Sequence, residues 1–506
     1  MFVSWAGLTI GQSSVDALLF ARYGVDVLPV LYLLLGVLLF AASLAVTALL
    51  ARTARNKLFP SMPLALASLL AAGRLWVAAG SELVYPALWL FAGLALLAQL
   101  SYLWGTAGLV TDTRQAKRLF PLFAAGGIAG AAVGGLLTDP LARVLGPENL
   151  LLVWACLLIA SSGLATAVIS RWGGASRDLP TGRQHRVGAL LAVRDGYRTV
   201  RRSALLRWMA AGAVLFSVLF YSLYLPFSAA AVERFPEAGE LAGFLGAFHG
   251  IATGVALLVS LFAANRLFAR FGTPALLLAY TIAYVAGFAV LAVDASFLLL
   301  VAVRFVMVIM MQGLANSAWE AMINVTPPER RDEARVFLNG VPAQAGTALA
   351  GVLLLLGQES LEPQQLFLIG LGAAVLAALT MWQARRSYGA AVADTLRAGR
   401  PHVFDVDVEP FAGMRTDAAA VSAALAGLSD VDPRVRRVAA EVLGTLGDPE
   451  LATPLRSALR DADATVRAAA IRSLGRLGEQ SVLADVADRL SDIDPEVRLA
   501  ALQVLR

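Results

Sequence analysis

Three ionisable side chains lie within long apolar stretches of the sequence and are the first candidates for binding chemistry: Asp16, Arg304 and Glu320. A charge in such surroundings is expensive unless it faces water or a partner. A carboxylate and a guanidinium could bind the opposite ends of a polar, charged solute. They could equally pair with each other and hold one conformation closed, and the sequence leaves both interpretations open.

Polar side chains near these charges recur at helical spacing, so each set would lie on one face of a helix. Hydrogen bonding between helices would explain any one set by itself. Four such sets together favour a polar cavity lined by four helices. The sets are Thr9, Gln12, Ser13 and Asp16; Gln99, Tyr102 and Thr106; Ser217, Tyr221, Tyr224 and Ser228; and Arg304, Gln312, Asn316 and Glu320. The residues expected to bind solute are Gln12, Asp16, Gln99, Tyr102, Tyr221, Tyr224, Arg304, Gln312, Asn316 and Glu320.

Other chemistries have little support in the sequence. The chain has three His and one Cys, Cys156, which excludes a disulfide framework and makes a metal site unexpected. No nucleophile–base pair is visible, so we do not expect an enzyme. No phosphate-binding P-loop motif is present, so ATP hydrolysis and a bound cofactor are not expected either. The net charge of +5 needs no nucleic-acid partner, because its basic residues gather in short loops.

The segments that carry these polar sets must be solvated by lipid. The chain is 58% hydrophobic and 15% charged, whereas soluble proteins carry about a quarter charged residues. A membrane span needs about 20 apolar residues in a helix. The sequence therefore predicts an all-α fold with a twelve-helix transmembrane bundle. Its spans lie near 2–20, 26–50, 62–80, 84–110, 119–138, 149–170, 206–230, 240–263, 274–292, 296–322, 337–357 and 364–383.

The short loops alternate in charge. Basic loops contain Arg52, Arg55 and Lys57; Arg114, Lys117 and Arg118; Arg266 and Arg270; and Arg330, Arg331 and Arg335. The opposite loops read SELVYP, ERFPEAGE and GQESLEPQQ, and they are acidic or neutral. The positive-inside rule places the basic set, and with it both termini, in the cytoplasm. The expected location is a bacterial inner membrane.

Two segments of the chain repeat each other. Residues 114–137 (RQAKRLFPLFAAGGIAGAAVGGLL) align with residues 331–354 (RDEARVFLNGVPAQAGTALAGVLL), so that Arg114 matches Arg331 and Gly134 matches Gly351. The two six-span halves are therefore predicted to be parallel repeats. That organisation resembles the major facilitator superfamily, in which two halves surround a central path. Glycines at four-residue spacing (Gly126, Gly130 and Gly134; Gly246, Gly250 and Gly254) predict close helix crossings where the halves meet.

Specific strings resemble the ATP/ADP translocase (nucleotide transporter) family of obligate intracellular bacteria and plastids. They are SYLWGTAGLVTDTRQAKRLFPLFAAGG, DALLFARYGVDVLP and WEAMINVTPPER, and the resemblance extends over residues 10–385. It implies nucleotide exchange, or transport of a related anionic metabolite. The family has a Lys before the Asp of its first span, where this chain has Val15, and no Lys lies in any span core. Phosphates prefer Arg or Lys donors, so the resemblance supports the fold better than the substrate.

The last part of the chain is a tandem repeat. Asp432-Pro433-Arg434-Val435-Arg436 recurs at Asp463–Arg467 and Asp494–Arg498, with a step of 31 residues each time. This pattern resembles HEAT repeats, which are stacked helix pairs forming an α-solenoid. The Asp is expected to cap a helix, the Val to face the core, and the final Arg to bond the neighbouring repeat. Because the third repeat ends at Arg506, we expect further repeats to follow.

The predicted organisation has five parts: a six-helix half (1–170), a cytoplasmic linker (171–205), a second six-helix half (206–385), a linker (386–412) and the HEAT domain (413–506). The first functional hypothesis is a secondary transporter that works by alternating access. Its expected partners are the lipid bilayer, a small polar or anionic solute such as ATP or ADP, and a protein that binds the HEAT domain. The alternative is a non-transporting scaffold or sensor that presents the HEAT domain. A scaffold would not need a polar cavity, so the polar sets favour the transporter.

Overall fold

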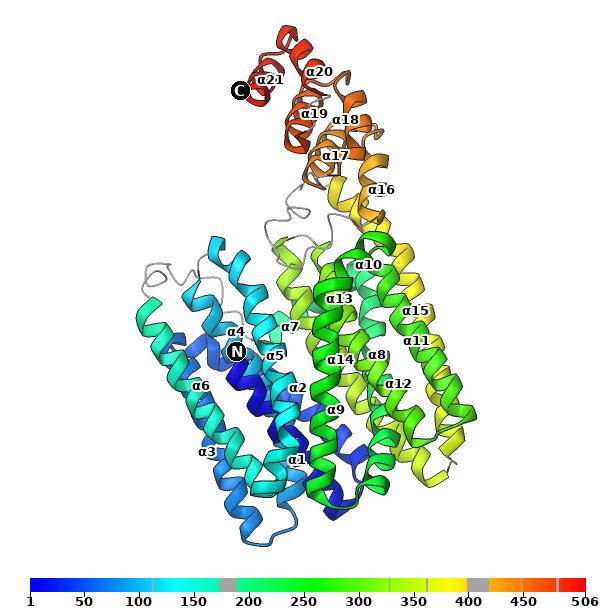
Figure 1. Cartoon of the computed structure of the whole chain (residues 1–506). Helices are drawn as coiled ribbons and strands as arrows, with labels where there is room; N and C mark the ends of the chain where they lie inside the picture. Colours follow the sequence, from blue (N-terminus) through cyan, green and yellow to red (C-terminus); the bar gives the residue numbers. More distant parts are fainter. Residues whose placement is uncertain are drawn as a thin grey trace.

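A computed structural model describes residues 1–111, 113–172, 189–326, 328–360, 363–397, 418–446, 448–478 and 482–506. Within these ranges every regular element is a helix. A helical bundle lies below a smaller stack of helices that ends at the C-terminus (Figure 1). We call the end of the bundle next to this stack the repeat-domain side, and the opposite end the far side.

The first half of the bundle contains α1 (Phe2–Tyr23), α2 (Leu28–Arg52), α3 (Arg55–Ala78), α4 (Val84–Val110), α5 (Thr113–Leu145), the short η1 (Pro147–Asn149) and α6 (Leu150–Trp172). Within the described residues, eleven helices of the chain are long and apolar enough to cross a membrane, and α1 is not among them. Helix α1 nevertheless packs against α4, α5, α6 and α9 (Ala238–Leu258). Ser4, Ser13, Ser14 and Asp16 are buried against these helices, which explains why α1, the first of the predicted spans, can be less apolar than the other eleven.

The second half contains α8 (Ala204–Arg234), α9, η3 (Val259–Ala263), α10 (Ala264–Phe271), α11 (Thr273–Val293), α12 (Phe297–Met310), η4 (Met311–Ala315), α13 (Asn316–Asn324), α14 (Pro328–Ser360) and α15 (Pro363–Arg397). Segments η3 and η4 are π-helical turns within otherwise continuous spans. A π turn adds a residue to the helix and shifts the faces on either side of it. The predicted stripe from Arg304 to Glu320 assumed an uninterrupted α-helix, and η4 breaks that register.

The two halves meet where α5 packs on α9 and α2 on α14, and α1 also packs on α9. A Cβ atom built on Gly250 would lie 2.7 Å from the Ala132 carbonyl oxygen, and one on Gly135 would lie 2.5 Å from the Gly246 carbonyl oxygen. The predicted role of Gly246 and Gly250 is thus confirmed. Gly130 and Gly134 instead face α1 of their own half, and Gly135 takes the place predicted for them on α5. The helical order puts these α5–α9 crossings toward the far side (Figure 1).

Replacing Gly250 with Ala is expected to destabilise the protein by about 1–3 kcal/mol, because the new methyl group must displace backbone atoms of α5. Gly254 is the matched control on the same helix, since its added Cβ would lie an ordinary 3.8 Å from the Ala132 Cβ. Thermal unfolding of the purified full chain should separate Gly250→Ala from Gly254→Ala. Equal unfolding temperatures for the two variants would contradict a tight crossing at Gly250.

Two predicted linkers are partly helical. Within 171–205, residues 189–202 form α7 (Ala189–Arg202), which packs on α14, while residues 173–188 lie outside the described residues. Within 386–412, α15 continues as a helix to Arg397, and residues 398–412 lie outside the described residues. The helix continues because Tyr388 and Val392 are buried in a core shared with the C-terminal stack. The polar residues around them indicated a linker, but Tyr388 and Val392 are four positions apart and therefore lie on one face of the helix, which packs against the core.

The C-terminal stack contains α16 (Ala418–Gly427), α17 (Pro433–Leu446), η8 (Pro449–Leu451), α18 (Ala452–Ala458), α19 (Ala464–Leu477), α20 (Leu483–Ala487), η10 (Asp488–Ser491) and α21 (Pro495–Leu505). Val435, Val466 and Val497 are buried, as the repeat predicted. The carboxylates of Asp463 and Asp494 accept hydrogen bonds from backbone N–H groups in the first turns of α19 and α21. Helix α15 packs on α16 and α17, and α10 also contacts α16, so the stack rests on the second half.

Arginines link neighbouring repeats, which confirms the structural role predicted for them. Arg436 donates two hydrogen bonds to Asp461, at 2.7 and 2.8 Å, and Arg467 donates two to Asp492, at 2.9 and 2.8 Å. Arg467 also donates to the carbonyl oxygen of Asp461 at 2.9 Å. Each arginine therefore binds its own turn and the next repeat at once.

Replacing Arg467 with Met is expected to destabilise the repeats by about 1.5–3 kcal/mol, the usual contribution of hydrogen bonds to charged groups. The control is Arg472→Met, because the Arg472–Glu496 pair is longer, at 3.5 Å, and more exposed than the Arg467–Asp492 pair. Hydrogen exchange in α19 and α21 of the full chain should rise in the Arg467 variant only. Similar exchange in both variants would show that the hydrogen bonds between Arg467 and Asp492 do not hold the repeats together.

The same arginine–aspartate hydrogen bonds predict that the repeats lose stability in acid. Hydrogen bonds from Arg436 and Arg467 lower the pKa values of Asp461 and Asp492 below their ordinary range. A lowered pKa in the folded state contributes stability above the ordinary carboxyl pKa of about 4, and that stability is lost as the pH falls below it. Exchange in α19 and α21 should therefore increase below about pH 4, and less so in Arg467→Met.

Candidate functional site

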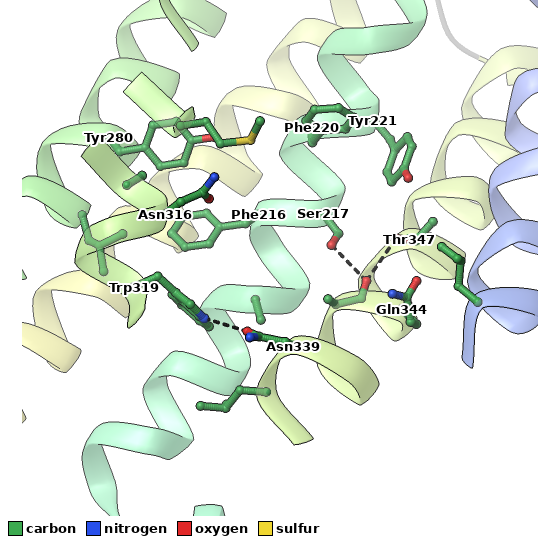
Figure 2. Close-up of a pocket in the computed structure, with 17 residues that line it drawn as sticks. Phe216, Ser217, Phe220, Tyr221, Tyr280, Asn316, Trp319, Asn339, Gln344 and Thr347 are labelled. Carbon is green, nitrogen blue, oxygen red and sulfur yellow. Dashed lines mark hydrogen bonds between the residues drawn. The ribbon is translucent and has the colours of Figure 1, made fainter. Parts of the chain in front are cut away.

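A pocket of about 360 Å³ lies in the second half, at its boundary with the first. Its walls come from α8, α11, η4, α13 and α14, and Leu39 of α2 supplies the contribution of the first half (Figure 2). Helix α8 begins at the repeat-domain side, and α13 ends there. The pocket residues on α8 (213–221) and on α13 therefore lie nearer that side than the far side.

The pocket combines aromatic rings with uncharged polar groups. The rings are Phe216, Phe220, Tyr221, Tyr280 and Trp319, and the polar side chains are Ser217, Asn316, Asn339, Gln344 and Thr347. None of its lining residues is Asp, Glu, Lys or Arg. Rings bury apolar area, and a few polar groups fix orientation, which is the usual make-up of a small-molecule site.

A hydrogen-bond chain holds the pocket edge between α13 and α14. The Trp319 indole N–H donates to Asn339 Oδ1 at 3.0 Å, and Asn339 Nδ2 donates to Glu320 Oε1 at 3.1 Å. The other Glu320 oxygen accepts from Arg335 Nε at 2.9 Å. Glu320 is therefore neutralised by Arg335 and acts here by orienting Asn339, and through it the Trp319 ring.

A second polar cluster joins the two halves beyond the pocket. Asp16 of α1 is 3% exposed and accepts hydrogen bonds from Trp89 Nε1 at 2.8 Å and from the Tyr224 hydroxyl at 2.7 Å. Trp89 belongs to α4 and Tyr224 to α8, so one carboxylate connects three helices. Asp16 is closer to the C-terminal end of α1, which places this bond toward the far side.

Arg304 of α12 lies over the ring of the same tyrosine, Tyr224. It is 2% exposed, and its guanidinium is centred 4.2 Å from the Phe220 ring and 5.2 Å from the Tyr224 ring. Its Nη1 is 3.5 Å from the Phe220 carbonyl oxygen, and its Nε has no hydrogen-bond partner. Among the described residues no carboxylate forms an ion pair with it. Asp16 and Arg304 thus both contact Tyr224, Asp16 at its hydroxyl and Arg304 at its ring.

The residues predicted from sequence are distributed over several places. Tyr221 and Asn316 line the pocket, Glu320 lies at its edge, and Asp16, Tyr224 and Arg304 form the second cluster. Gln12 is exposed and Gln312 half-buried, and neither lines the pocket.

Two other predicted residues turn into the first half. The Gln99 amide donates to the Ser4 carbonyl oxygen at 3.0 Å, and the Tyr102 hydroxyl bonds Ser4 and Ser161. Tyr102 lines a separate pocket of about 250 Å³ in that half. In this conformation the four polar stripes therefore do not line one continuous cavity, because the stripe on α4 serves contacts with α1 and α6.

Sequence reasoning missed Phe216, Phe220, Trp319, Asn339 and Gln344. The rings looked like ordinary core residues. Asn339 and Gln344 gave a weak signal, since both are amides inside the predicted span 337–357. The prediction for that span used only its match to residues 114–137, including the alignment of Gly351 with Gly134, and gave its amides no role.

Comparisons with known proteins agree with this architecture. Residues 421–506 match the family model of HEAT repeats. No curated protein matches the sequence. The chain is similar to the crystal structure of a bacterial homologue of the iron transporter ferroportin in an inward-facing state, with 15% identity and a TM-score of 0.54, over 75% of this chain and 97% of that one. It is also similar to the nucleoside transporter NupG, with 13% identity and a TM-score of 0.53, over 76% and 97%.

These similarities concern the fold. The prediction of an all-α chain, with a transmembrane helical bundle followed by HEAT-repeat helices, is confirmed, and the bundle shares its fold with these two structures. The chain is a multi-pass membrane protein. Neither similar structure belongs by its printed name to the ATP/ADP translocase family, so that assignment stays a prediction.

Proposed function

We propose that the chain is a secondary transporter that moves a small solute by alternating access. The observation that carries the proposal is the pocket of about 360 Å³ near the repeat-domain side, combined with tight crossings of the halves toward the far side. A bundle that is closed at one end and has a binding pocket nearer the other has the form expected of one state of such a cycle.

The repeat-domain side is proposed to face the cytoplasm. Arg330, Arg331 and Arg335 lie in or near the connection between α13 and α14 at that side, and basic loops favour the cytoplasm. Both termini and the HEAT repeats would then be cytoplasmic, in a bacterial inner membrane. Because the stack rests on α15 and α10, it would move with the second half and could couple a protein partner to transport.

Nucleotide exchange, which the family resemblance implies, has less support from the pocket. Phosphates are usually bound by Arg or Lys, and the pocket lining has neither. Arg304 lies behind the Phe220 ring, so ATP or ADP could reach it only after that ring moved. The scaffold alternative gives no role to the buried Arg304, because burying a charge that has no ion-pair partner among the described residues costs a static bundle stability.

Cysteine accessibility tests the proposal. In a Cys156→Ala background, Asn316→Cys should react with a membrane-impermeant thiol reagent added from the repeat-domain side, and much more slowly from the far side. Leu34→Cys, an exposed position on α2 outside the pocket, is the control that should not react from either side. Equal reaction of Asn316→Cys and Leu34→Cys, or none at Asn316→Cys from the repeat-domain side, would rule out a solute pocket there.

A further inference from the structure

We infer that the solute of this pocket is an uncharged, planar ring compound that carries hydrogen-bonding groups on its edge. The inference rests on the proposed transport function and names the class of substrate. Of the polar or anionic solute expected from the sequence, it favours the polar, uncharged kind over the nucleotide.

The absence of charge in the lining is the first argument. A carboxylate or phosphate entering the pocket would lose its water without gaining a cationic partner there. Glu320 and Arg335 at the pocket edge already neutralise each other, and the Phe220 ring covers Arg304 on the side of the pocket. An uncharged solute has no such desolvation cost.

The arrangement of rings is the second argument. Phe216 contacts Trp319 and Tyr280, with ring centroids 5.9 and 5.6 Å apart. Figure 2 shows these three rings on one side of the pocket, with Ser217, Gln344 and Thr347 on the other. A planar ring could stack against the aromatic side and present its polar edge to the opposite side.

The polar groups supply the third argument. Gln344 Oε1 is buried without a hydrogen-bond partner, so it can accept a hydrogen bond from the solute. Asn339 is held by Trp319 and Glu320, so the position of the Trp319 ring is fixed before a solute arrives. A pocket of about 360 Å³ is at the small end of ligand sites, which suits one or two fused rings better than a nucleotide.

Matched probes test the inference by titration of the purified full chain, read out by tryptophan fluorescence and thermal unfolding. Nicotinamide and adenine are the uncharged planar probes. Nicotinate has the ring of nicotinamide with a negative charge, and cyclohexanecarboxamide has the amide without a planar ring. Nicotinamide and adenine should bind at least about tenfold more tightly than the other two.

Variants then locate the binding. Trp319→Leu and Gln344→Leu should each weaken adenine and nicotinamide by about tenfold, whereas Trp208→Leu, on α8 outside the pocket, should not. Gln344→Leu keeps the inference testable if Trp319→Leu fails to fold.

Nicotinate binding as tightly as nicotinamide, no binding of either uncharged planar probe, or binding unchanged in Gln344→Leu would each overturn the inference. The proposed transport function fails by a separate observation, the sidedness of Asn316→Cys labelling. The two failures can therefore be told apart.

Discussion

Replacing Asp16 with Ala is expected to abolish transport and to destabilise the protein. The Asp16 carboxylate accepts hydrogen bonds from Trp89 and Tyr224, and both donors would stay buried without a partner. Each unsatisfied buried group costs about 1–3 kcal/mol. Because the Tyr224 bond also joins α1 to α8, its loss would weaken the closed far side. The measurement is uptake into proteoliposomes together with thermal unfolding.

Tyr224→Phe isolates the contact between the halves, because it removes the hydroxyl and keeps the ring beside Arg304. It should lower transport by about tenfold, the equivalent of one charged hydrogen bond. Tyr284→Phe is the matched control: its hydroxyl is also buried, but it bonds only Tyr280 of the same helix. Equal transport by the two variants would show that the Asp16–Tyr224 bond does not hold the halves.

The second large effect is expected at Arg304. Arg304→Met removes the guanidinium that lies over the Tyr224 ring, while Asp16 stays bonded to the Tyr224 hydroxyl, so the variant should lose about 1–3 kcal/mol of stability and nearly all transport. Adding Asp16→Asn removes the uncompensated charge and should recover at least half of the lost stability. Transport should not recover, because the cluster between the halves is gone.

The control for this cycle is Glu320→Gln in the Arg304→Met background. Glu320 is engaged by Arg335 and Asn339, so its removal should not rescue stability. Additive effects of Asp16→Asn and Arg304→Met on the unfolding temperature would contradict electrostatic coupling between them. Arg304 would then be better explained as a residue that binds an anionic solute.

Features with a short repeat in the sequence were predictable. The 31-residue step located the capping Asp, the buried Val and the bridging Arg of the HEAT repeats, because each repeat solves the same packing problem. Eleven of the predicted spans followed from apolar length alone. The amphipathic helix α7 and the continuation of α15 were not predicted. Both segments are rich in polar residues, and the few apolar residues that form their buried faces gave too weak a pattern.

The site was less predictable because it depends on which way a polar face turns. Gln99 and Tyr102 belong to a polar helical stripe, as Tyr221 and Asn316 do on their own helices. The first two residues nevertheless bond within their own half, whereas the other two line the pocket. Helical spacing defines a face but not the helix that covers it. The π turn at η4 also rotates the helix faces on its two sides relative to each other, and no residue pattern in the sequence predicted it.

The central claim, that the two halves alternate between closure at the far side and closure at the repeat-domain side, is tested most directly by paired spin-label distances. In the Cys156→Ala background, one pair joins Leu83 and Val293, which are exposed on the two halves at the far side. The other pair joins Trp172 and Phe271, exposed on the two halves at the repeat-domain side. Pulsed electron paramagnetic resonance on the full chain in lipid measures both.

If the halves alternate, Tyr224→Phe lengthens the Leu83–Val293 distance in part of the population and shortens the Trp172–Phe271 distance in the same proportion. Tyr284→Phe should leave both distributions unchanged. A single narrow distance at each pair, identical in the parent chain and in Tyr224→Phe, would describe a rigid scaffold and would contradict alternating access.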